Sequence, residues 1–480
     1  MSPADRVFPS SHDAPLTLGL RELSGLLRSR KLSPVEVLEA VADAYEAGPS
    51  QFRPFLAVDF DMAKDAAIKL TETGCRDETT PLFGVPMSIK DLEPTLDFPT
   101  TDGARAVGPA RERVDGLFAE RVRNAGCVIF AKTNTPAFGH KDTTDNLLAA
   151  ATTNPWDSSK TPGGSSGGAA VVVASGLGPV AHGTDAAGSV RMPAALCGVV
   201  GFKPSYGRIP RLPNNDLWAA RGHHGILART VDDVVVMMDA VAGGDERDPL
   251  SISAKEWTDV PRRPRRGRIA YLRSFFDQDV DAQLAETIEQ SLTKIERAGI
   301  PIERPELSWP DPFPWISQVT ALGAHSRFGE LSAASPELFD DTHLAIIRAG
   351  ADVSAEDVTA AHGARTRLYG SAVDFMSRYD FVLTPTLPLT AWPIDVAHPL
   401  INGRETERAP GGRWSDVLLA NLLGWPAISI PCGLSAGLPV GLQIMAPWHA
   451  DAACLTFAAD LEQILMFREL PPPNPTRAFR

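Results

Sequence analysis

Apolar residues recur at helical spacing in several segments of the chain. Residues 16–47 repeat apolar positions every three or four residues, with a break in the middle, which predicts two amphipathic helices. Ser33, Pro34 and Glu36 have the pattern of a capping box, so the second helix should begin at Ser33. Further helices are predicted at 115–124, 230–243, 281–299 and 354–379, with Thr230 and Ser354 as N-caps and Gly299 as the end of the third.

Short apolar runs bounded by proline and glycine predict strands. They lie at 81–91, 125–134, 269–273, 380–388, 426–433 and 438–447. Between 81 and 134 the order is strand, helix, strand, which is typical of an α/β sheet with parallel pairs. We expect a surface connector at 260–268 and an extended tail at 471–480, and we find no internal repeat.

Composition restricts the class of protein. The chain has 480 residues, of which 44% are hydrophobic and 22% charged, as in folded globular proteins. A formal net charge of -13 argues against binding to duplex DNA or to an anionic membrane. No apolar run is long enough to span a membrane, and the first residues lack a signal-peptide pattern. The five cysteines are scattered without a CxxC pair, which indicates reduced thiols and a cytoplasmic protein.

A run of small residues, TPGGSSGG at 161–168, is the first candidate for chemistry. A phosphate-binding loop would need a lysine after the glycines, and none follows. A linker would not lead directly into the apolar run AAVVVASG. Residues 163–167 match the G-x-S-x-G pattern of a hydrolase nucleophile elbow, but that turn needs a strand before it and NPWDSSKTP does not have the pattern of one.

A second cluster of small residues and a lysine suggest a different chemistry. Ser189 ends the stretch GTDAAGS, which offers backbone amides beside a hydroxyl. Lys90 ends an apolar strand in GVPMSIKD, so its amine should be buried. Burial lowers the pKa of a lysine and makes it a usable base near neutrality. Ser189, Ser165 and Lys90 can then pass protons without a histidine.

These stretches together resemble the amidase signature family. The resemblance is carried by GVPMSIKD, KTNTPAFG, TPGGSSGGAA, GTDAAGSVRMPAALCGVVGFKPSYGR and NLLGWPAISIPCG, and it covers nearly all of the chain. It implies an α/β fold with a central mixed, twisted β-sheet covered by helices on both faces. One domain of residues 1–480 is expected, with an N-terminal helical region at about 1–60, a catalytic core at about 80–230, a variable helical insert at about 245–410 and the end of the core at about 415–480.

The resemblance also assigns roles to residues of this chain. It implies that Ser189 is the nucleophile, Ser165 a bridging serine after a cis peptide bond from Gly164, and Lys90 the base. The oxyanion hole falls on the backbone amides of four residues, Ala186, Ala187, Gly188 and Ser189. The family commonly has glycine where this chain has Ala187. Structural support is expected from Gly164, Ser166, Asp185 and Arg191, and substrate contacts from Gly139, His140, Arg208, Leu212 and Trp218.

The expected activity is hydrolysis of C–N bonds in amides, through an acyl-enzyme on Ser189. The apolar segment with Leu212, Leu217 and Trp218 suits a bulky or aryl amide, and a urethanase that cleaves aryl carbamates is a further specialisation.

No metal or cofactor is expected, because the adjacent His223 and His224 lack a third ligand at a suitable spacing. The expected partner is a small-molecule amide or carbamate, without nucleic acid or membrane, and the protein should be a monomer or a homodimer.

Three other functions remain open from the sequence. One is the glutaminase subunit of a tRNA-dependent amidotransferase, which the same family contains. The second is an esterase with Ser165 in a nucleophile elbow and a histidine as its base. The third is a catalytically silent binding protein on an amidase scaffold, against which the complete set of Lys90, Ser165 and Ser189 argues.

Overall fold

The computed structural model describes residues 14–75, 80–107, 114–212, 221–253, 267–406 and 414–467. Its helices are α1 (Ala14–Thr17), α2 (Leu20–Arg28), α3 (Pro34–Glu46), α4 (Phe60–Thr73), α5 (Leu117–Asn124), α6 (Gly167–Ala174), α7 (Arg191–Cys197), α8 (Val231–Val241), α10 (Ala282–Arg297), α11 (Phe313–Ala334), α12 (Asp341–Ala349), α13 (Ala355–Met376), α14 (Ser415–Leu423) and α15 (Asp451–Leu465). Its strands are β1 (Phe55–Val58), β2 (Pro86–Lys90), β3 (Val128–Thr133), β4 (Val180–Asp185), β5 (Val200–Lys203), β6 (His223–Ala228), β7 (Ile269–Tyr271), β8 (Ile302–Glu303), β9 (Phe381–Pro385), β10 (Leu400–Ile401), β11 (Arg404–Glu405), β12 (Ala427–Ser435) and β13 (Leu438–Met445).

Three helices begin directly after the N-cap residues that the sequence predicts. Ser33 and Glu36 form the capping box of α3, and Ser354 forms one with Asp357 at α13. The Thr230 hydroxyl accepts the amide of Asp233 at the start of α8. Each cap satisfies backbone donors that a first helical turn leaves free. The connector at 260–268 and the tail at 471–480 lie mostly or wholly outside the described residues.

A mixed sheet of eight strands forms the centre of the molecule. Its strand order is β4-β6-β5-β12-β13-β9-β7-β8, antiparallel as far as β9 and parallel beyond it. A second sheet has the order β1-β3-β2, and its β2–β3 pair is parallel and joined through α5, as the sequence predicts. The mixed, helix-covered sheet expected from the sequence is therefore confirmed.

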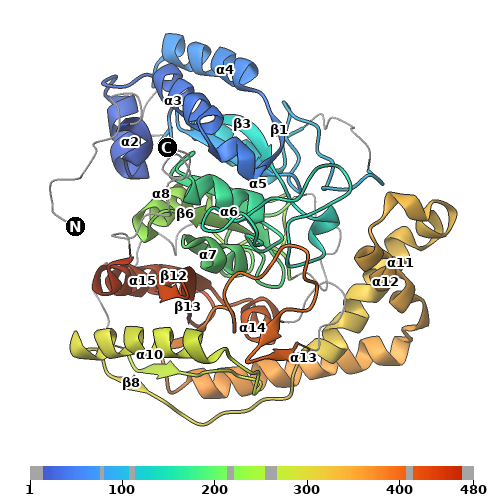
Figure 1. The fold of residues 1–480 in the computed structure, drawn as a ribbon. Coiled ribbons are helices and arrows are strands. Elements are labelled where there is room, and N and C mark those ends of the chain that lie inside the picture. The colour runs from blue at the N-terminus through green and yellow to red at the C-terminus, as the bar shows by residue number, and fades with distance from the viewer. Residues whose placement is uncertain are drawn as a thin grey trace.

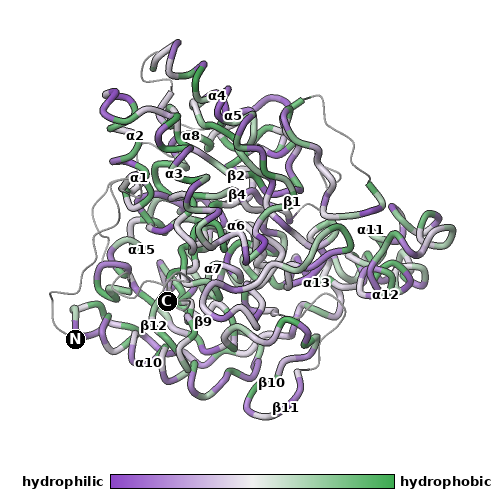
Figure 2. Tube along the Cα trace, turned by 45° about the horizontal axis from the view of Figure 1, so that its top comes forward, coloured by the Kyte–Doolittle hydropathy of each residue, from purple (hydrophilic) through white to green (hydrophobic). Residues whose placement is uncertain are grey.

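Helices cover both faces of the eight-stranded sheet (Figure 1). Buried residues of α8, α10 and α15 pack on one face, and those of α6, α7, α13 and α14 pack on the other. Figure 2 shows hydrophobic stretches of the trace in the interior around β2, β4 and α6, where most side chains are buried. Burial of this apolar surface is the main stabilising term of the fold.

Helices α11 and α12 lie at one side of the molecule, away from the eight-stranded sheet (Figure 1). They contact the rest of the molecule through a small separate cluster, in which Phe339, Leu344 and Ile347 pack with Phe138 and Ala106. Among the described residues, no helix is long and apolar enough to cross a membrane. The result is a helical lobe that reaches the segment around Phe138, which leads to the site below.

Candidate active site

Lys90 is the last residue of β2, and its side chain is fully buried. Its Nζ lies 2.7 Å from Ser165 Oγ, 2.9 Å from Ser166 Oγ and 3.0 Å from Thr184 Oγ1. Burial lowers the pKa of Lys90 well below its usual value, and the positive charge of Arg211 acts in the same direction against the opposing effect of Asp185. Burial therefore favours the neutral form of the amine.

Ser165 lies in a turn between a loop and α6. The Gly164–Ser165 peptide bond is cis. A Cβ atom at Gly164 would lie 2.5 Å from the carbonyl oxygen of Thr143, so only glycine lets the two backbones approach this closely. No strand precedes Ser165 between 161 and 164, so the turn lacks the strand that a nucleophile elbow requires.

Ser189 lies in the loop between β4 and α7, with 7% of its surface exposed. Its carbonyl oxygen accepts the amide of Ser166 at 3.1 Å, so the two serine-bearing segments lie side by side. Gly188 has a φ of +101°, and a Cβ atom there would lie 2.6 Å from Val417 Cγ1. Glycine is therefore required just before Ser189 both by the backbone conformation and by the packing of α14.

The loop before Ser189 presents free backbone donors. Within the described part of the chain, the amides of Ala186, Ala187 and Ser189 have no hydrogen-bond acceptor. The Gly188 amide instead donates to Asp185 Oδ1 at 2.7 Å, because the loop folds back over that carboxylate. The Gly188 amide is thus already engaged by Asp185, and its expected place in the oxyanion hole stays a prediction.

A buried charge network supports this loop. Asp185 Oδ2 also accepts the amide of Val190 at 3.2 Å, and both carboxylate oxygens accept from Arg191 at 3.0 Å. Asn421 donates to Asp185 Oδ1 at 2.9 Å and accepts from Arg191 at 2.6 Å. Burial alone would raise the pKa of Asp185, but Arg191 holds it well below the usual range. The carboxylate is therefore ionised and ties the loop to α7 and α14.

One of the residues expected to contact substrate, Gly139, lies beside Ser165, and a second, His140, follows it in the chain. Gly139 faces the Ser165 hydroxyl, since a Cβ atom there would lie 3.0 Å from Ser165 Oγ. His140 follows, and its Nε2 lies 3.2 Å from Asp340 Oδ1, just before α12. Its ring stacks on His343 with 4.7 Å between ring centroids. The helical lobe of α11 and α12 thus borders the segment that flanks Ser165.

The other three residues expected to contact substrate form hydrogen bonds with residues other than the two serines, or lie outside the described residues. Arg208 is 1% exposed, and its Nε donates to Asp451 at 3.3 Å, which is a contact between two buried structural groups. Leu212 is exposed, and its carbonyl accepts the amide of Leu117 at the start of α5. Trp218, together with Leu217, lies outside the described residues. These contacts give no support to a substrate-binding role for Arg208, and the roles of Leu212 and Trp218 stay predictions.

Sequence reasoning did not single out Thr184, although it lies in the GTDAAGS stretch five residues before Ser189. Its hydroxyl is one of the three around the Lys90 amine. Sequence reasoning also missed Asn421, which lies 236 residues from Asp185. Only the stretch NLLGWPAISIPCG pointed to the region of Asn421, and nothing in it indicated the contact.

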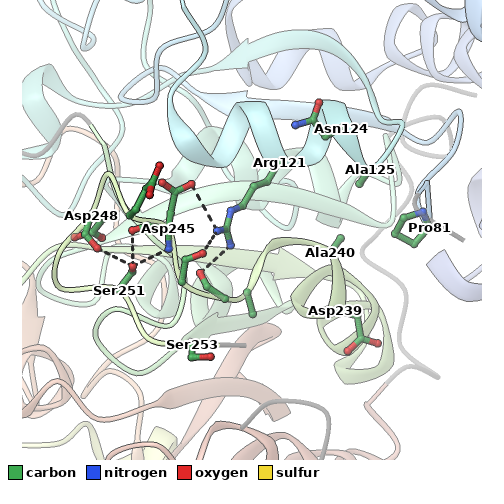
Figure 3. A pocket seen from close by; sticks show the side chains of 14 residues that line it. Pro81, Arg121, Asn124, Ala125, Asp239, Ala240, Asp245, Asp248, Ser251 and Ser253 are labelled. Carbon is green, nitrogen blue, oxygen red and sulfur yellow. Dashed lines mark hydrogen bonds and ion pairs between the residues drawn. The ribbon is translucent and has the colours of Figure 1, made fainter. Parts of the chain in front are cut away.

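A polar groove of about 860 Å³ lies elsewhere on the surface, between α5 and α8 (Figure 3). Arg121 projects into it, but carbonyl groups and Asp245 already bind its guanidinium. Neither serine nor Lys90 lines this groove. His223 and His224 are buried and packed, and the described residues contain no cluster of three potential metal ligands. The chemistry-bearing residues therefore gather at the Lys90 site.

Comparison with known proteins agrees with this geometry. The Amidase family model matches residues 36–455. The chain is 33% identical to an acylamidase of Rhodococcus erythropolis, over 93% of this chain and 95% of the relative. It is 30% identical to a glutamyl-tRNA(Gln) amidotransferase subunit of Sulfurihydrogenibium sp., over 89% of this chain and 93% of the relative.

A solved structure shares the whole fold. It is that of a bacterial aryl acylamidase of the amidase signature family, which superposes with a TM-score of 0.86 at 26% identity, covering 95% of this chain and 98% of the other. Family model, relative and structure each extend over nearly the whole chain. The chain therefore belongs to the amidase signature family of amide-hydrolysing enzymes.

Proposed function

We propose that this protein hydrolyses amides through an acyl-enzyme on Ser189, with Ser165 and Lys90 as the proton relay. The observation that carries the proposal is the contact of 2.7 Å between Ser165 Oγ and the fully buried Nζ of Lys90. A neutral amine has two hydrogens and one lone pair, so it can accept a proton from a single hydroxyl at a time.

The directions of the hydrogen bonds exclude one of the three hydroxyls as the proton donor. The Ser166 hydroxyl donates to the carbonyl oxygen of Thr184 at 3.2 Å, so it can only accept from Lys90. One amine hydrogen is then directed to Ser166 Oγ, and we assign the other to Thr184 Oγ1, which leaves the lone pair for Ser165. This arrangement prepares Ser165 to give its proton to Lys90.

Acylation follows from this arrangement. Ser189 Oγ attacks the amide carbonyl and gives its proton to Ser165, whose own proton passes to Lys90 Nζ. The tetrahedral oxyanion accepts hydrogen bonds from the amides of Ala186, Ala187 and Ser189, which have no acceptor in the described structure. The relay returns the proton to the departing nitrogen, and the C–N bond breaks.

Deacylation repeats these steps with water. Water attacks the ester carbonyl of the acyl-enzyme and gives a proton to the relay, and Ser189 Oγ leaves with that proton. The products are a carboxylic acid and an amine, and the enzyme returns to its starting protonation state. No step needs a group that the chain does not supply.

The substrate that we propose is a bulky or aryl amide, and an aryl carbamate is a further candidate. The names of the similar proteins, an acylamidase and an aryl acylamidase, support the amide. An anilinic leaving group is a weaker base than an alkylamine, so its departure needs less help from the relay. Burying an aryl ring can contribute about 1.5–3 kcal/mol, roughly ten- to a hundredfold in affinity.

A hydrolysis panel tests this function. We expect kcat/KM to be highest for a nitroanilide or an N-aryl carbamate and lowest for acetamide, and we expect Ser189→Ala to abolish all three activities. Higher kcat/KM for acetamide would contradict the aryl preference. Full activity of Ser189→Ala would contradict the mechanism.

The similarity to amidotransferase subunits favours one alternative, a glutaminase that works with partner subunits. The same panel separates the two functions when glutamine is included. An enzyme that works alone should cleave the anilide without any partner. Activity on glutamine alone, seen only after partner subunits are added, would favour the alternative.

A further inference from the structure

The backbone of Lys90 is held by a side chain from the neighbouring sheet. β2 is an edge strand of its sheet, so the amides on its outer side have no strand partner. The outward amide of Lys90 donates to Nδ1 of His182 in β4, at 3.2 Å. Both residues are fully buried. A buried amide without an acceptor is costly, so this contact fixes the end of β2 against β4.

The same strand also holds the tip of the lysine. His182 and Thr184 are two residues apart on β4, so their side chains point to the same face. His182 accepts the Lys90 amide, and Thr184 Oγ1 lies 3.0 Å from Lys90 Nζ. Strand β4 therefore contacts Lys90 at its backbone amide and at its Nζ atom. These two contacts set the position of the amine relative to Ser165.

The contact requires one protonation state of His182. A backbone N–H can only donate, so Nδ1 must be unprotonated, and a neutral ring then carries its hydrogen on Nε2. That Nε2 lies 3.0 Å from Nδ1 of His224 in β6, which accepts it. His224 must then carry its own hydrogen on Nε2, which lies 3.8 Å from Glu93 Oε2.

The surroundings favour this neutral arrangement. The Phe118 ring lies against both imidazoles, with centroid distances of 4.2 Å and 5.3 Å. Burial holds the pKa of His182 well below its usual value. The direction of hydrogen bonding is thus fixed from the Lys90 amide to His182 and from His182 to His224.

We infer that His182, kept in one tautomer by His224, is a positioning residue that places the Lys90 amine between its three hydroxyl partners. The inference rests on the proposed role of Lys90 as the base. His182 touches neither substrate nor the reacting atoms, so its effect should fall on kcat rather than on KM. The side chain of His182 acts through one atom, the acceptor Nδ1. Another side chain with an acceptor at a similar distance from the backbone can replace it.

The test compares two substitutions of His182 with a matched control, using the nitroanilide as substrate. Asparagine places its Oδ1 near the position of Nδ1, so His182→Asn should keep kcat within about threefold. His182→Leu lacks the acceptor and should lower kcat at least tenfold, with KM within about threefold. Val180→Ala removes buried atoms two residues away on β4 without touching the Lys90 amide, and it should keep the wild-type kcat.

The tautomer supplies a readout that a purely structural role would not change. In protein labelled with ¹⁵N-histidine, the resonances assigned by their loss in His182→Asn should show an unprotonated Nδ1 and a protonated Nε2. In His224→Leu the acceptor for Nε2 is gone, so the Nδ1-protonated form should become populated and kcat should fall at least threefold. The signal must be resolved among those of ten histidines.

Each outcome supports or overturns the inference. It is overturned if Nδ1 of His182 is protonated in the wild type, or if His182→Leu keeps the wild-type kcat while Lys90→Ala is inactive. If His182→Leu does not fold, the wild-type spectrum and the kcat of His224→Leu still decide. Full activity of Lys90→Ala would instead overturn the proposed function itself.

Discussion

Burial of the Lys90 amine affects both activity and stability as the pH changes. The proposed base works only when neutral, and burial lowers its pKa. We therefore expect kcat/KM to rise as the pH increases through this lowered pKa, and Lys90→Ala to lose amide hydrolysis with the fold intact. A pH series of anilide hydrolysis measures this. An unchanged rise with pH in Lys90→Ala would show that another group is the base.

Stability should respond to the same group with a defined sign. Between the lowered pKa of folded Lys90 and the unfolded value of about 10.4, the unfolded chain binds a proton that the folded protein does not. The stability from Lys90 therefore rises with pH across this window. In denaturant unfolding, the free energy of unfolding of the wild type should increase relative to that of Lys90→Met from pH 7 to about 10. A difference that stays constant with pH would contradict the lowered pKa.

Gly188 should tolerate no side chain. Its φ of +101° disfavours any L-residue, and the new Cβ would lie 2.6 Å from Val417. Gly437→Ala is a matched control, because its φ is +80° but nothing lies within 4 Å of a Cβ there. The control should lose about 1–2 kcal/mol, and Gly188→Ala clearly more, as measured by urea unfolding. Equal losses would mean that the contact with Val417 costs nothing.

At the scale of elements, Arg191 connects its own helix α7 with elements in other parts of the chain. It lies at the start of α7, and its guanidinium binds Asp185 of β4 and the carbonyl oxygen of Val417 in α14. Arg191→Met leaves a buried carboxylate without its cation, which typically costs about 3–5 kcal/mol. Thermal unfolding of Arg191→Met and of the double variant Asp185→Asn/Arg191→Met measures this.

The double variant should be the more stable of the two, since it removes the unpaired charge as well. Because Arg191 lowers the pKa of Asp185, the wild-type pair stabilises the protein above the unfolded pKa of about 3.9 and this contribution is lost as the pH falls. If Arg191→Met unfolds at the wild-type temperature, the network does not hold the loop.

The helical lobe meets the segment beside Ser165 through Asp340. This residue caps α12 by accepting the amide of His343, and it also faces His140 and Lys141. Burial raises the pKa of Asp340, but its hydrogen bonds and the charge of Lys141 lower that pKa by more, so the carboxylate is ionised. Asp340→Asn keeps the cap and removes the charge.

We expect Asp340→Asn to speed hydrogen exchange at residues 136–142 and to raise KM for the nitroanilide severalfold. The exchange of β12 and β13 in the core should not change. The exposed Glu337→Gln, in the turn before α12, is the control and should match the wild type. If Asp340→Asn shows wild-type exchange in this segment, the ion pairs do not couple the lobe to the site.

At the scale of the whole molecule, local patterns predicted the elements that carry their own signals. The β2–α5–β3 unit and the capped helices α3, α8 and α13 follow from periodicity and cap residues. The antiparallel order of most of the large sheet does not, because it depends on pairings between distant strands such as β5 and β12. Helix α11 was missed, because its apolar residues do not lie on one face and only Ile316 and Ala321 are buried.

The site divides in the same way. Lys90, Ser165 and Ser189 lie in stretches with recognisable residue patterns, so the sequence could name them. Thr184, His182 and Asn421 act through contacts across the fold, and no local pattern marks them. The hydrogen bond from the Gly188 amide to Asp185 is likewise not marked in the sequence, because it depends on how the loop turns back over that carboxylate.

The most direct test of the mechanism is the position of a covalent adduct. A serine-reactive phosphonate should label the nucleophile, and peptide mass spectrometry locates the label. The mechanism predicts an adduct on Ser189, with labelling strongly slowed in Lys90→Ala because Ser165 then has no base. An adduct on Ser165, or labelling of Ser189 at the wild-type rate in Lys90→Ala, would contradict it.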